Sequence, residues 1–346
     1  MLTSENTIQN YSLKSHNSFR FDCIAEYYTE VKTPHDIELA VDFADQNNLK
    51  ITVLGGGSNI VFVNPKINGL VVRPVEATEN NFSYKKISGS NVIHVTATAG
   101  SNWHSLVLDT IEKGLGGLEN LSLIPGTVGA APIQNIGAYG VELNDRFVSL
   151  RAFHIPTKKW QTLSTEDCEF SYRDSLFKHE HDQFIISDVT LAVSSTQPTV
   201  TNYRDVTEYL QNNGIQKADF SAISHAICVI RGRKLPDPAK LPNAGSFFHN
   251  PVISGQHFRD LETAYPGIVG YPQPNGQVKV AAGWLIDTLG LKGYTEDGIG
   301  VHKDQALVLV HFGESNGKTL IRMANFIRQR VESEFDIKLD IEPRLL

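Results

Sequence analysis

The stretch of sequence that decides the fold runs from residue 51 to residue 63 and reads ITVLGGGSNIVFV. A short apolar segment, Ile51–Leu54, precedes the glycine-rich loop Gly55–Asn59, and the β-branched and aromatic run Ile60–Val63 follows it. A doubly wound dinucleotide-binding fold needs a strand, a glycine-rich turn and then a helix. Because the order here is strand, glycines and strand, we exclude that fold for this loop.

The flanking sequence alternates between helical and extended patterns. Before the loop, Thr33–Asn48 predicts an amphipathic helix that Thr33 caps and in which Pro34 occupies the first turn. Further along, a helix is expected over Ser101–Lys113, where Gly114 can end it. Strands are expected at Leu70–Val72, Val92–Ala99, Phe147–Ile155 and Phe184–Val193, and helices at Tyr203–Asn212 and Ala222–Ile230.

The character of the chain changes after Arg231. A rigid connection is predicted over Lys234–Pro238 and a turn over Pro242–Gly245. Beyond them, helices at Val280–Leu289 and Lys318–Phe335 are expected to flank a buried strand, Ala306–His311, and Ile337–Ile341 is expected to be the final strand. We place a domain boundary near residue 220.

Composition narrows the class of protein. The 346 residues carry a formal net charge of −7, whereas nucleic-acid-binding domains are usually basic, so we expect no nucleic-acid partner. The polar N-terminus lacks a secretory pattern and no run approaches the ~20 apolar residues of a membrane helix. Three widely spaced cysteines, Cys23, Cys168 and Cys228, indicate reduced thiols. We therefore expect a soluble cytoplasmic protein without membrane insertion, and a monomer because no heptad seam is present.

Two loops are candidates for ligand binding. Consecutive glycines in Gly55–Asn59 can turn backbone N–H groups toward one anion, although a tight turn between strands is the alternative. Residues 124–140 read IPGTVGAAPIQNIGAYG, and such a density of small residues indicates backbone laid against a large or flat ligand. A buried loop packed on helices is the alternative, but long loops in compact domains are usually functional.

Together these loops resemble the FAD-binding domain of the UDP-N-acetylenolpyruvoylglucosamine reductase family, and the resemblance extends from Asn17-Ser18-Phe19 to Glu342-Pro343. It implies the α+β fold of the vanillyl-alcohol oxidase and p-cresol methylhydroxylase class. A two-part FAD-binding domain would span residues 1–220, with parts at about 1–70 and 71–220. A substrate-binding α+β domain would span 221–346, with its last strand and tail returning toward the FAD domain.

The resemblance also implies which residues bind FAD, without a covalent bond. These are Gly55, Gly56, Gly57, Ser58, Asn59, Pro125, Gly126, Thr127, Val128, Gly129, Asn135, Gly137, Ala138 and Tyr139.

Three residues are implied to be catalytic, and each has a plainer reading. Arg173, in Tyr172-Arg173-Asp174, offers a planar fork for a carboxylate, although a surface ion pair with Asp174 is the alternative. Ser246 follows a glycine and by itself reads as a turn residue, whereas the resemblance makes it the proton donor to a substrate carbon. Glu342 by itself reads as a solvated carboxylate, whereas the resemblance makes it the catalytic glutamate.

Four more residues are implied to bind substrate: Tyr172, Tyr203, Lys234 and Asn250. The family commonly has a lysine where this chain has His249, so the charge at this position differs here.

The implied reaction is the reduction of UDP-N-acetylglucosamine enolpyruvate to UDP-N-acetylmuramate, a precursor of peptidoglycan, with NADPH as co-substrate. No NADPH-binding motif is recognisable, which agrees with both substrates using the same flavin face in turn. Three rival hypotheses are a flavin oxidase of the same fold, a nucleotide-binding module without catalysis and a structural protein. The cluster His179-Glu180-His181-Asp182 lacks the helical spacing of a zinc site, so we interpret it as an exposed polar loop.

Overall fold

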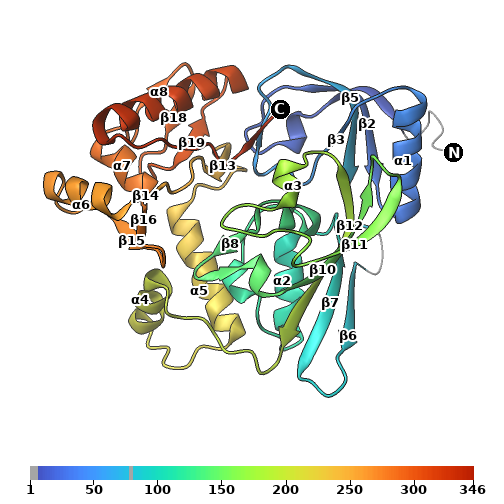
Figure 1. The fold of residues 1–346 in the computed structure, drawn as a ribbon, viewed down its shortest axis with the longest axis horizontal. Helices are drawn as coiled ribbons and strands as arrows, with labels where there is room; N and C mark the ends of the chain where they lie inside the picture. Colours follow the sequence, from blue (N-terminus) through green and yellow to red (C-terminus); the bar gives the residue numbers. More distant parts are fainter. Residues whose placement is uncertain (1–6, 78–80) are drawn as a thin grey trace. The chain divides into compact units, whose positions relative to one another are not determined.

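The structure, a computed structural model, describes residues 7–77 and 81–346 and divides the chain into two compact units (Figure 1). Unit 1 comprises Met1–Tyr11, Ala25–Gly56 and Ile67–Arg231, and unit 2 comprises Ser12–Ile24, Gly57–Lys66 and Gly232–Leu346. The first six residues of the polar N-terminus and residues 78–80 lie outside the described part. The mixture of helices and strands in both units confirms the predicted α+β class. The functional boundary near residue 220 stays a prediction, because the compactness of the two units does not tell which residues bind FAD and which bind substrate.

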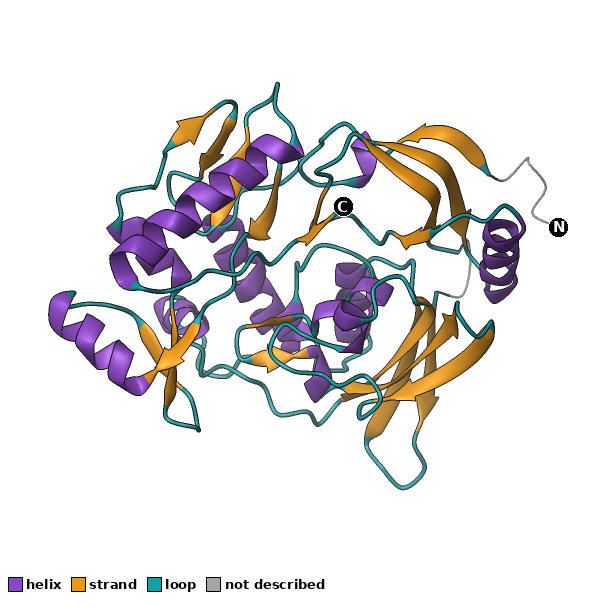
Figure 2. Ribbon diagram, turned by 45° about the horizontal axis from the view of Figure 1, so that its top comes forward, coloured by secondary structure: helices purple, strands orange, loops and turns teal. Residues whose placement is uncertain are grey.

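The first sheet of unit 1 has the strand order β1-β2-β5-β3. Its strands are β1 (Ile8–Ser12), β2 (Ile24–Val31), β5 (Lys66–Pro74) and β3 (Ile51–Val53), and β3 runs parallel to β5. Helix α1 (Pro34–Gln46) lies along this sheet (Figure 2) and buries Ile37, Ala40, Val41 and Ala44 against strand residues.

The beginning of α1 confirms the predicted cap. The Thr33 hydroxyl accepts a hydrogen bond from the Asp36 backbone N–H at 3.2 Å, and the Asp36 carboxylate accepts one from the Thr33 N–H at 2.9 Å. This reciprocal pair satisfies two backbone donors that a helix otherwise leaves open.

The second sheet of unit 1 is antiparallel, with the strand order β11-β10-β12-β7-β6. Its strands are β6 (Phe82–Lys86), β7 (Val92–Thr98), β10 (Phe147–His154), β11 (Lys159–Ser164) and β12 (Phe184–Ser194). Helix α2 (Trp103–Glu112) buries Trp103, Leu106 and Val107 in the core of this part. The predicted helix over Ser101–Lys113 is thus confirmed, and Gly114 follows it with a φ of +70°.

The segment that follows α2, which includes the small-residue loop 124–140, contains no long helix. It folds into 3₁₀ turns at Glu119–Leu121, Val128–Ala130, Pro132–Gln134 and Leu143–Asp145, together with a hairpin of β8 (Gly137–Ala138) and β9 (Val141–Glu142). Later in unit 1, the short α3 (Leu176–His179) precedes α4 (Arg204–Asn212) and α5 (Phe220–Lys234), and α4 and α5 share a small apolar core. Helix α5 continues to Lys234, beyond its predicted end at Ile230.

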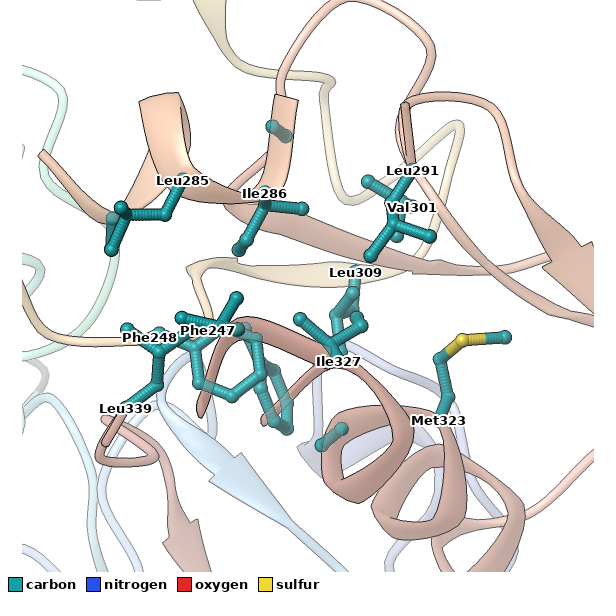
Figure 3. Close-up of a cluster of buried hydrophobic side chains, with 14 of the residues drawn as sticks. Phe247, Phe248, Leu285, Ile286, Leu291, Val301, Leu309, Met323, Ile327 and Leu339 are labelled. Carbon is teal, nitrogen blue, oxygen red and sulfur yellow. The ribbon is translucent and has the colours of Figure 1, made fainter. Parts of the chain in front are cut away.

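Unit 2 is built around the antiparallel sheet β13-β19-β18-β17. Its strands are β13 (Asn243–Ser246), β17 (Thr295–Glu296), β18 (Ile299–Val301) and β19 (Val308–His311). Helices α7 (Ala282–Thr288) and α8 (Gly317–Phe335) pack on this sheet, and Figure 3 shows Phe247 and Phe248 among Leu285, Ile286 and Ile327. The helix α6 (Gly255–Ala264) and the sheet of β14 (Val252–Ser254), β16 (Gln277–Val280) and β15 (Gly270–Pro272) were not predicted.

Two predictions for unit 2 are wrong. The expected turn at Pro242–Gly245 is largely strand β13, whose pairing with β19 shifts register between Asn243 and Ser246. The expected final strand, Ile337–Ile341, forms only one bridge, from Ile341 to Phe248, and the last strand is β20 (Arg344–Leu345), parallel to β4 (Ile60–Val61). Apolar residues alternate with polar ones in this segment because Ile337 and Leu339 are buried in the core. The segment is extended, but it forms no sheet ladder.

Within the described residues, no helix combines the length and the apolar character that crossing a membrane requires.

The first turn of α8 supplies a test of packing. A Cβ atom on Gly317 would collide with the Phe62 carbonyl, whereas one on Gly232 in α5 would meet nothing within 4 Å. We expect Gly317→Ala to lower the free energy of unfolding by about 2 kcal/mol, since backbone must move to admit the methyl group. Gly232→Ala should be neutral or stabilising by about 0.5–1 kcal/mol. Urea denaturation measures both, and equal stabilities of the two variants would contradict the packing described.

Candidate functional site

The two predicted ligand-binding loops meet inside unit 1. A Cβ atom on Gly56 would lie 3.0 Å from the Cα atom of Gly126, and one on Gly55 would lie 3.1 Å from the Ala130 Cβ and 3.3 Å from the Thr127 Oγ1. A side chain at Gly55 or Gly56 would therefore push the two loops apart. The approach explains why both loops need small residues, although 70 positions separate them in the sequence.

The rest of the first loop belongs to unit 2 and is equally constrained there. Gly57 has a φ of +67°, and a Cβ atom on it would collide with the His16 carbonyl. The Gly57 carbonyl accepts a hydrogen bond from the Ser18 N–H at 3.0 Å, and the Asn59 carbonyl accepts one from the Arg344 N–H at 3.0 Å. Ser58 lies between these two anchored residues, and its carbonyl accepts a hydrogen bond from the Ser18 hydroxyl at 3.4 Å.

The second loop is fastened to the start of α2 by its backbone. The N–H groups of Val128 and Gly129 donate to the carbonyls of Ser101 and Ala99, each at 2.9 Å, and the Gly126 carbonyl accepts from the Trp103 N–H at 3.1 Å. A side chain on Gly129 would come within 2.5 Å of the Ala99 Cβ. Val128 is buried, Pro125 is exposed, and Gly126, Thr127 and Gly129 are half-buried. The loop is therefore fixed along one side while much of its backbone stays accessible.

Asn135 holds the middle of this loop. The side chain is fully buried, its Nδ2 donates to Glu142 Oε2 at 2.8 Å and to the Ser171 carbonyl at 3.1 Å, and its Oδ1 accepts from the Asn144 N–H at 3.0 Å. Because these three bonds hold the amide in place, Asn135 organises the loop. A direct contact between Asn135 and FAD stays a prediction.

Arg173 lies against the same loop. Its Nη2 donates to the Gly137 carbonyl at 2.6 Å, and its guanidinium carbon lies 5.6 Å from the centre of the Tyr172 ring. The neighbouring Asp174 carboxylate is 2.8 Å from His179 Nε2. The structure thus brings Arg173 and Tyr172 to the hairpin that carries the predicted cofactor residues Gly137 and Ala138.

A second aromatic contact joins a predicted FAD residue to a predicted substrate residue. The rings of Tyr139 and Tyr203 are perpendicular, with centroids 5.3 Å apart. The Tyr139 carbonyl accepts a hydrogen bond from Asn120 Nδ2 at 3.0 Å, and burial raises the pKa of the Tyr139 phenol to about 12. Tyr203 caps α4 and keeps 42% of its surface exposed, so it can meet a ligand.

Sequence reasoning missed Arg231, in the last turn of α5. Burial lowers the pKa of its guanidinium, and the like charge of Arg173 lowers it further. The Tyr139 phenol lies beside it, its Nε is buried without a hydrogen-bond partner, and no acidic residue in residues 7–77 and 81–346 forms an ion pair with it. A buried cation of this kind favours an anionic ligand. The sequence offered only an arginine near the end of a helix, which is a common surface pattern.

In unit 2, the tail of the chain brings Glu342 to the segment that follows β13. The Glu342 N–H donates to the Phe247 carbonyl at 2.9 Å, one residue after Ser246, and the His249 N–H donates to the Asp340 carbonyl at 3.0 Å. His249 Nδ1 is 3.6 Å from Glu342 Oε2, and both side chains are largely buried. Ser246, His249 and Glu342 therefore belong to one pair of adjacent segments.

The remaining predicted residues are placed as follows. Asn250 Oδ1 accepts a hydrogen bond from the Ala282 N–H at 3.0 Å, and Lys234 is the exposed last residue of α5. In the discounted polar cluster, Asp182 Oδ1 accepts from the Val53 N–H at 2.9 Å and so anchors β3. The described residues contain no group of three or more histidine, cysteine or acidic side chains placed to hold a metal ion.

The fold and the two loops define the class of protein. Residues 25–164 match the model of an FAD binding domain, and the structure fits that cofactor, since glycine backbone and a buried arginine suit a flat ligand with a pyrophosphate. Residues 237–346 match the C-terminal domain of UDP-N-acetylenolpyruvoylglucosamine reductase.

Comparison with whole proteins is more specific. The chain is 44% identical over 337 residues to the UDP-N-acetylenolpyruvoylglucosamine reductase of Cupriavidus pinatubonensis, covering 97% of this chain and 98% of that protein. It is 42% identical over 341 residues to the enzyme of the same name from Pseudomonas syringae pv. syringae, covering 96% and 97%. The chain therefore belongs to the UDP-N-acetylenolpyruvoylglucosamine reductase family, and it is an FAD-containing oxidoreductase.

A solved structure supports the fold. The crystal structure of the Thermus caldophilus reductase of this family aligns with a TM-score of 0.64 over 98% of this chain and 97% of that chain, at 20% sequence identity. The predicted fold class is confirmed by this likeness and by the two domain matches.

The contact between the two loops generates a prediction for FAD binding. Gly56→Ala places a methyl group 3.0 Å from Gly126 Cα, and we expect it to weaken FAD binding at least tenfold, about 1.4 kcal/mol. Titration of apoprotein with FAD, followed by quenching of flavin fluorescence, measures the affinity. Gly232→Ala is the control, because its methyl group meets nothing. Unchanged affinity in a folded Gly56→Ala protein would show that this contact does not shape the FAD site.

Proposed function

We propose that this chain reduces UDP-N-acetylglucosamine enolpyruvate to UDP-N-acetylmuramate in the cytoplasm, with bound FAD and with NADPH as the electron source. The observation that carries the proposal is the 44% identity to a reductase of this name over 98% of its length. A second support comes from unit 1, where Arg173 bonds the Gly137 carbonyl of the small-residue loop. The activity belongs to peptidoglycan precursor synthesis.

When bound, FAD supplies the hydride chemistry that protein side chains lack. Hydride addition to the outer carbon of the enolpyruvyl double bond leaves negative charge on the inner carbon and on its carboxylate. The chain must therefore provide positive charge and hydrogen-bond donors where this charge develops.

Arg173 is the proposed source of positive charge. A guanidinium stays charged throughout the working pH range and holds a carboxylate through two parallel hydrogen bonds. The bond from Nη2 to Gly137 and the contact with the Tyr172 ring orient the fork. Arg231 is proposed to add to the field from the same unit, because a buried cation that forms no ion pair with an acid in the described part of the chain strengthens the preference for anions.

Ser246 and Glu342 are the proposed acids. Ser246 donates a proton to the carbon that carries the developing charge, and Glu342 in its protonated form donates a hydrogen bond to the substrate carboxylate. Their support is the shared backbone pairing, which places both residues on two adjacent segments of unit 2. A serine hydroxyl is a weak acid, so its proton must be replaced from a neighbouring group or water.

Substrate contacts are proposed for Tyr172, Tyr203, Lys234 and Asn250. Tyr172 and Tyr203 keep 41% and 42% of their surfaces exposed. The bond from the Ala282 N–H fixes the Asn250 amide, which leaves Nδ2 as the donor for a ligand. Lys234 offers an exposed ammonium suited to a phosphate. Either the nucleotide sugar or NADPH presents phosphates to such residues.

The proposed function is tested under anaerobic conditions. Adding NADPH to the yellow protein should bleach the visible absorbance of the flavin, and adding the enolpyruvyl nucleotide sugar should restore it. Bleaching without restoration would exclude this substrate, and fast reoxidation by oxygen with a simple alcohol as electron donor would favour an oxidase.

Replacing Ser246 separates the two half-reactions. Ser246→Ala should bind FAD and be reduced by NADPH at the normal rate, while reoxidation by substrate slows by roughly 10²–10⁴-fold because the proton donor is lost. Stopped-flow absorbance measures each step. Ser83→Ala, on the exposed surface of β6, is the matched control. Normal reoxidation in Ser246→Ala would contradict the assigned role.

Arg173→Ala should slow the same oxidative step. The charge that Arg173 is proposed to stabilise develops on the enolpyruvyl substrate. An Arg173→Ala protein that is reduced slowly by NADPH but reoxidised normally by substrate would therefore contradict this role.

A further inference from the structure

The pair formed by His249 and Glu342 has a feature that the catalytic assignment does not use. The two side chains keep only 18% and 14% of their surfaces exposed, and the imidazole Nδ1 is 3.6 Å from the carboxylate Oε2. At this distance and degree of burial, the charge of each group acts on the other.

The surrounding backbone keeps the pair together. Phe248 bridges to Ile341, and hydrogen bonds on either side link His249 to Asp340 and Glu342 to Phe247. Phe247 and Phe248 are both buried in the core of unit 2, as Figure 3 shows. Neither segment can slide without breaking these bonds, so the backbone holds His249 and Glu342 side by side.

Several charged groups lie on the segments that surround the pair within unit 2. The tail carries Asp340, which is exposed, and Arg344, whose backbone N–H bonds to Asn59. From α8, Arg328 Nε donates to the Leu339 carbonyl at 2.8 Å. The segment before β19, which bonds to Phe247 through Leu307, carries His302, Lys303 and Asp304, and α7 carries Asp287 near its end.

We propose that His249 is a positioning residue that shares one proton with Glu342 and returns it to the Glu342 carboxylate when the substrate carboxylate arrives. This inference rests on the proposed function. In the step, the two side chains first approach to hydrogen-bond distance, the Nδ1–H bond of the imidazolium breaks and an O–H bond forms on Glu342 Oε2. The pair neither gains nor loses a proton, and no further reactant is needed.

The arriving anion drives this transfer. A carboxylate beside Glu342 disfavours a second negative charge and favours the protonated carboxyl, which then donates a hydrogen bond to the substrate. A histidine suits this task because its imidazole ordinarily changes charge between pH 5 and 8. When the pH is high enough to remove the shared proton, Glu342 should therefore no longer donate a hydrogen bond to the substrate.

The first test is the pH profile of flavin reoxidation by the enolpyruvyl nucleotide sugar in the reduced holoenzyme. The wild-type rate should fall on the alkaline side as the shared proton is lost. In His249→Gln the imidazole no longer holds the proton for Glu342, so the fall should move to lower pH by about one unit or more. His249→Lys holds its proton to higher pH, so the fall should move upward.

The matched control is His35→Gln in unit 1. His35 also faces a glutamate, with Nδ1 3.8 Å from Glu38 Oε2, but that pair is exposed. This change should leave the pH profile where it was. An alkaline limb that stays fixed, or that moves the same way in His249→Gln and His249→Lys, would overturn the proposal. A larger Kd for substrate, together with an alkaline limb of the pH profile that does not move, would also overturn the proposal. His249 would then be a simple binding residue.

The second test does not use activity. In the FAD-loaded protein without substrate, the ring of His249 can be followed by NMR, assigned by the signal missing from His249→Gln. Its titration should move to lower pH in Glu342→Gln, because the neighbouring negative charge is gone. An unmoved titration would overturn the pairing. If the nucleotide sugar fails to reoxidise the flavin of the wild type and of every variant at all pH values, the proposed function is wrong. The NMR titration of His249 still decides whether the pairing exists.

Discussion

The close approach of bare backbone at Gly55–Gly57 is the constraint on which the rest of the structure depends. Gly56 touches the second loop at Gly126, and the next residue, Gly57, fits under the His16 carbonyl with a left-handed backbone. Each contact lies within one unit, and each excludes a side chain. One short loop thus has to satisfy two packing requirements in succession, which only consecutive glycines can do.

Each unit carries its own kind of charged or proton-bearing group. Unit 1 buries the guanidinium of Arg231 near that of Arg173, and this arrangement favours a negatively charged ligand group. Unit 2 pairs a carboxylate with an imidazole and keeps a serine on the adjacent segment. A reaction that creates negative charge beside a carboxylate needs fixed cations and proton donors together. The chain contains both kinds of group, and the proposed reduction uses each for its own chemistry.

Much of the fold was predictable from local pattern. The strand on either side of the glycines, the capped helix α1 and the end of α2 at Gly114 all follow from backbone preferences within a few residues. The tail was not predictable in this way, because the alternation at Ile337 and Leu339 reports which side chains are buried and not whether the backbone has a sheet partner.

The candidate site divides similarly. The sequence predicted the small-residue loop and, through resemblance, Arg173, because their residue types are unusual in combination. It could not predict the burial of Arg231 or the closeness of His249 to Glu342, since both depend on segments that are far apart in the chain.

The backbone at the small-residue loop is strained at two residues that belong to the candidate site. Tyr139 and Arg173 have φ angles of +50° and +56°, in a region that costs a residue with a side chain about 1–2 kcal/mol. The strain persists because both residues are held by their carbonyls, Tyr139 by Asn120 Nδ2 and Arg173 by Lys178 Nζ at 2.9 Å. Ordinary turns in this chain carry the same strain, since Lys158 between β10 and β11 has a φ of +51°. A loop that must present a ring and a guanidinium to a bound ligand has a reason to stay as it is.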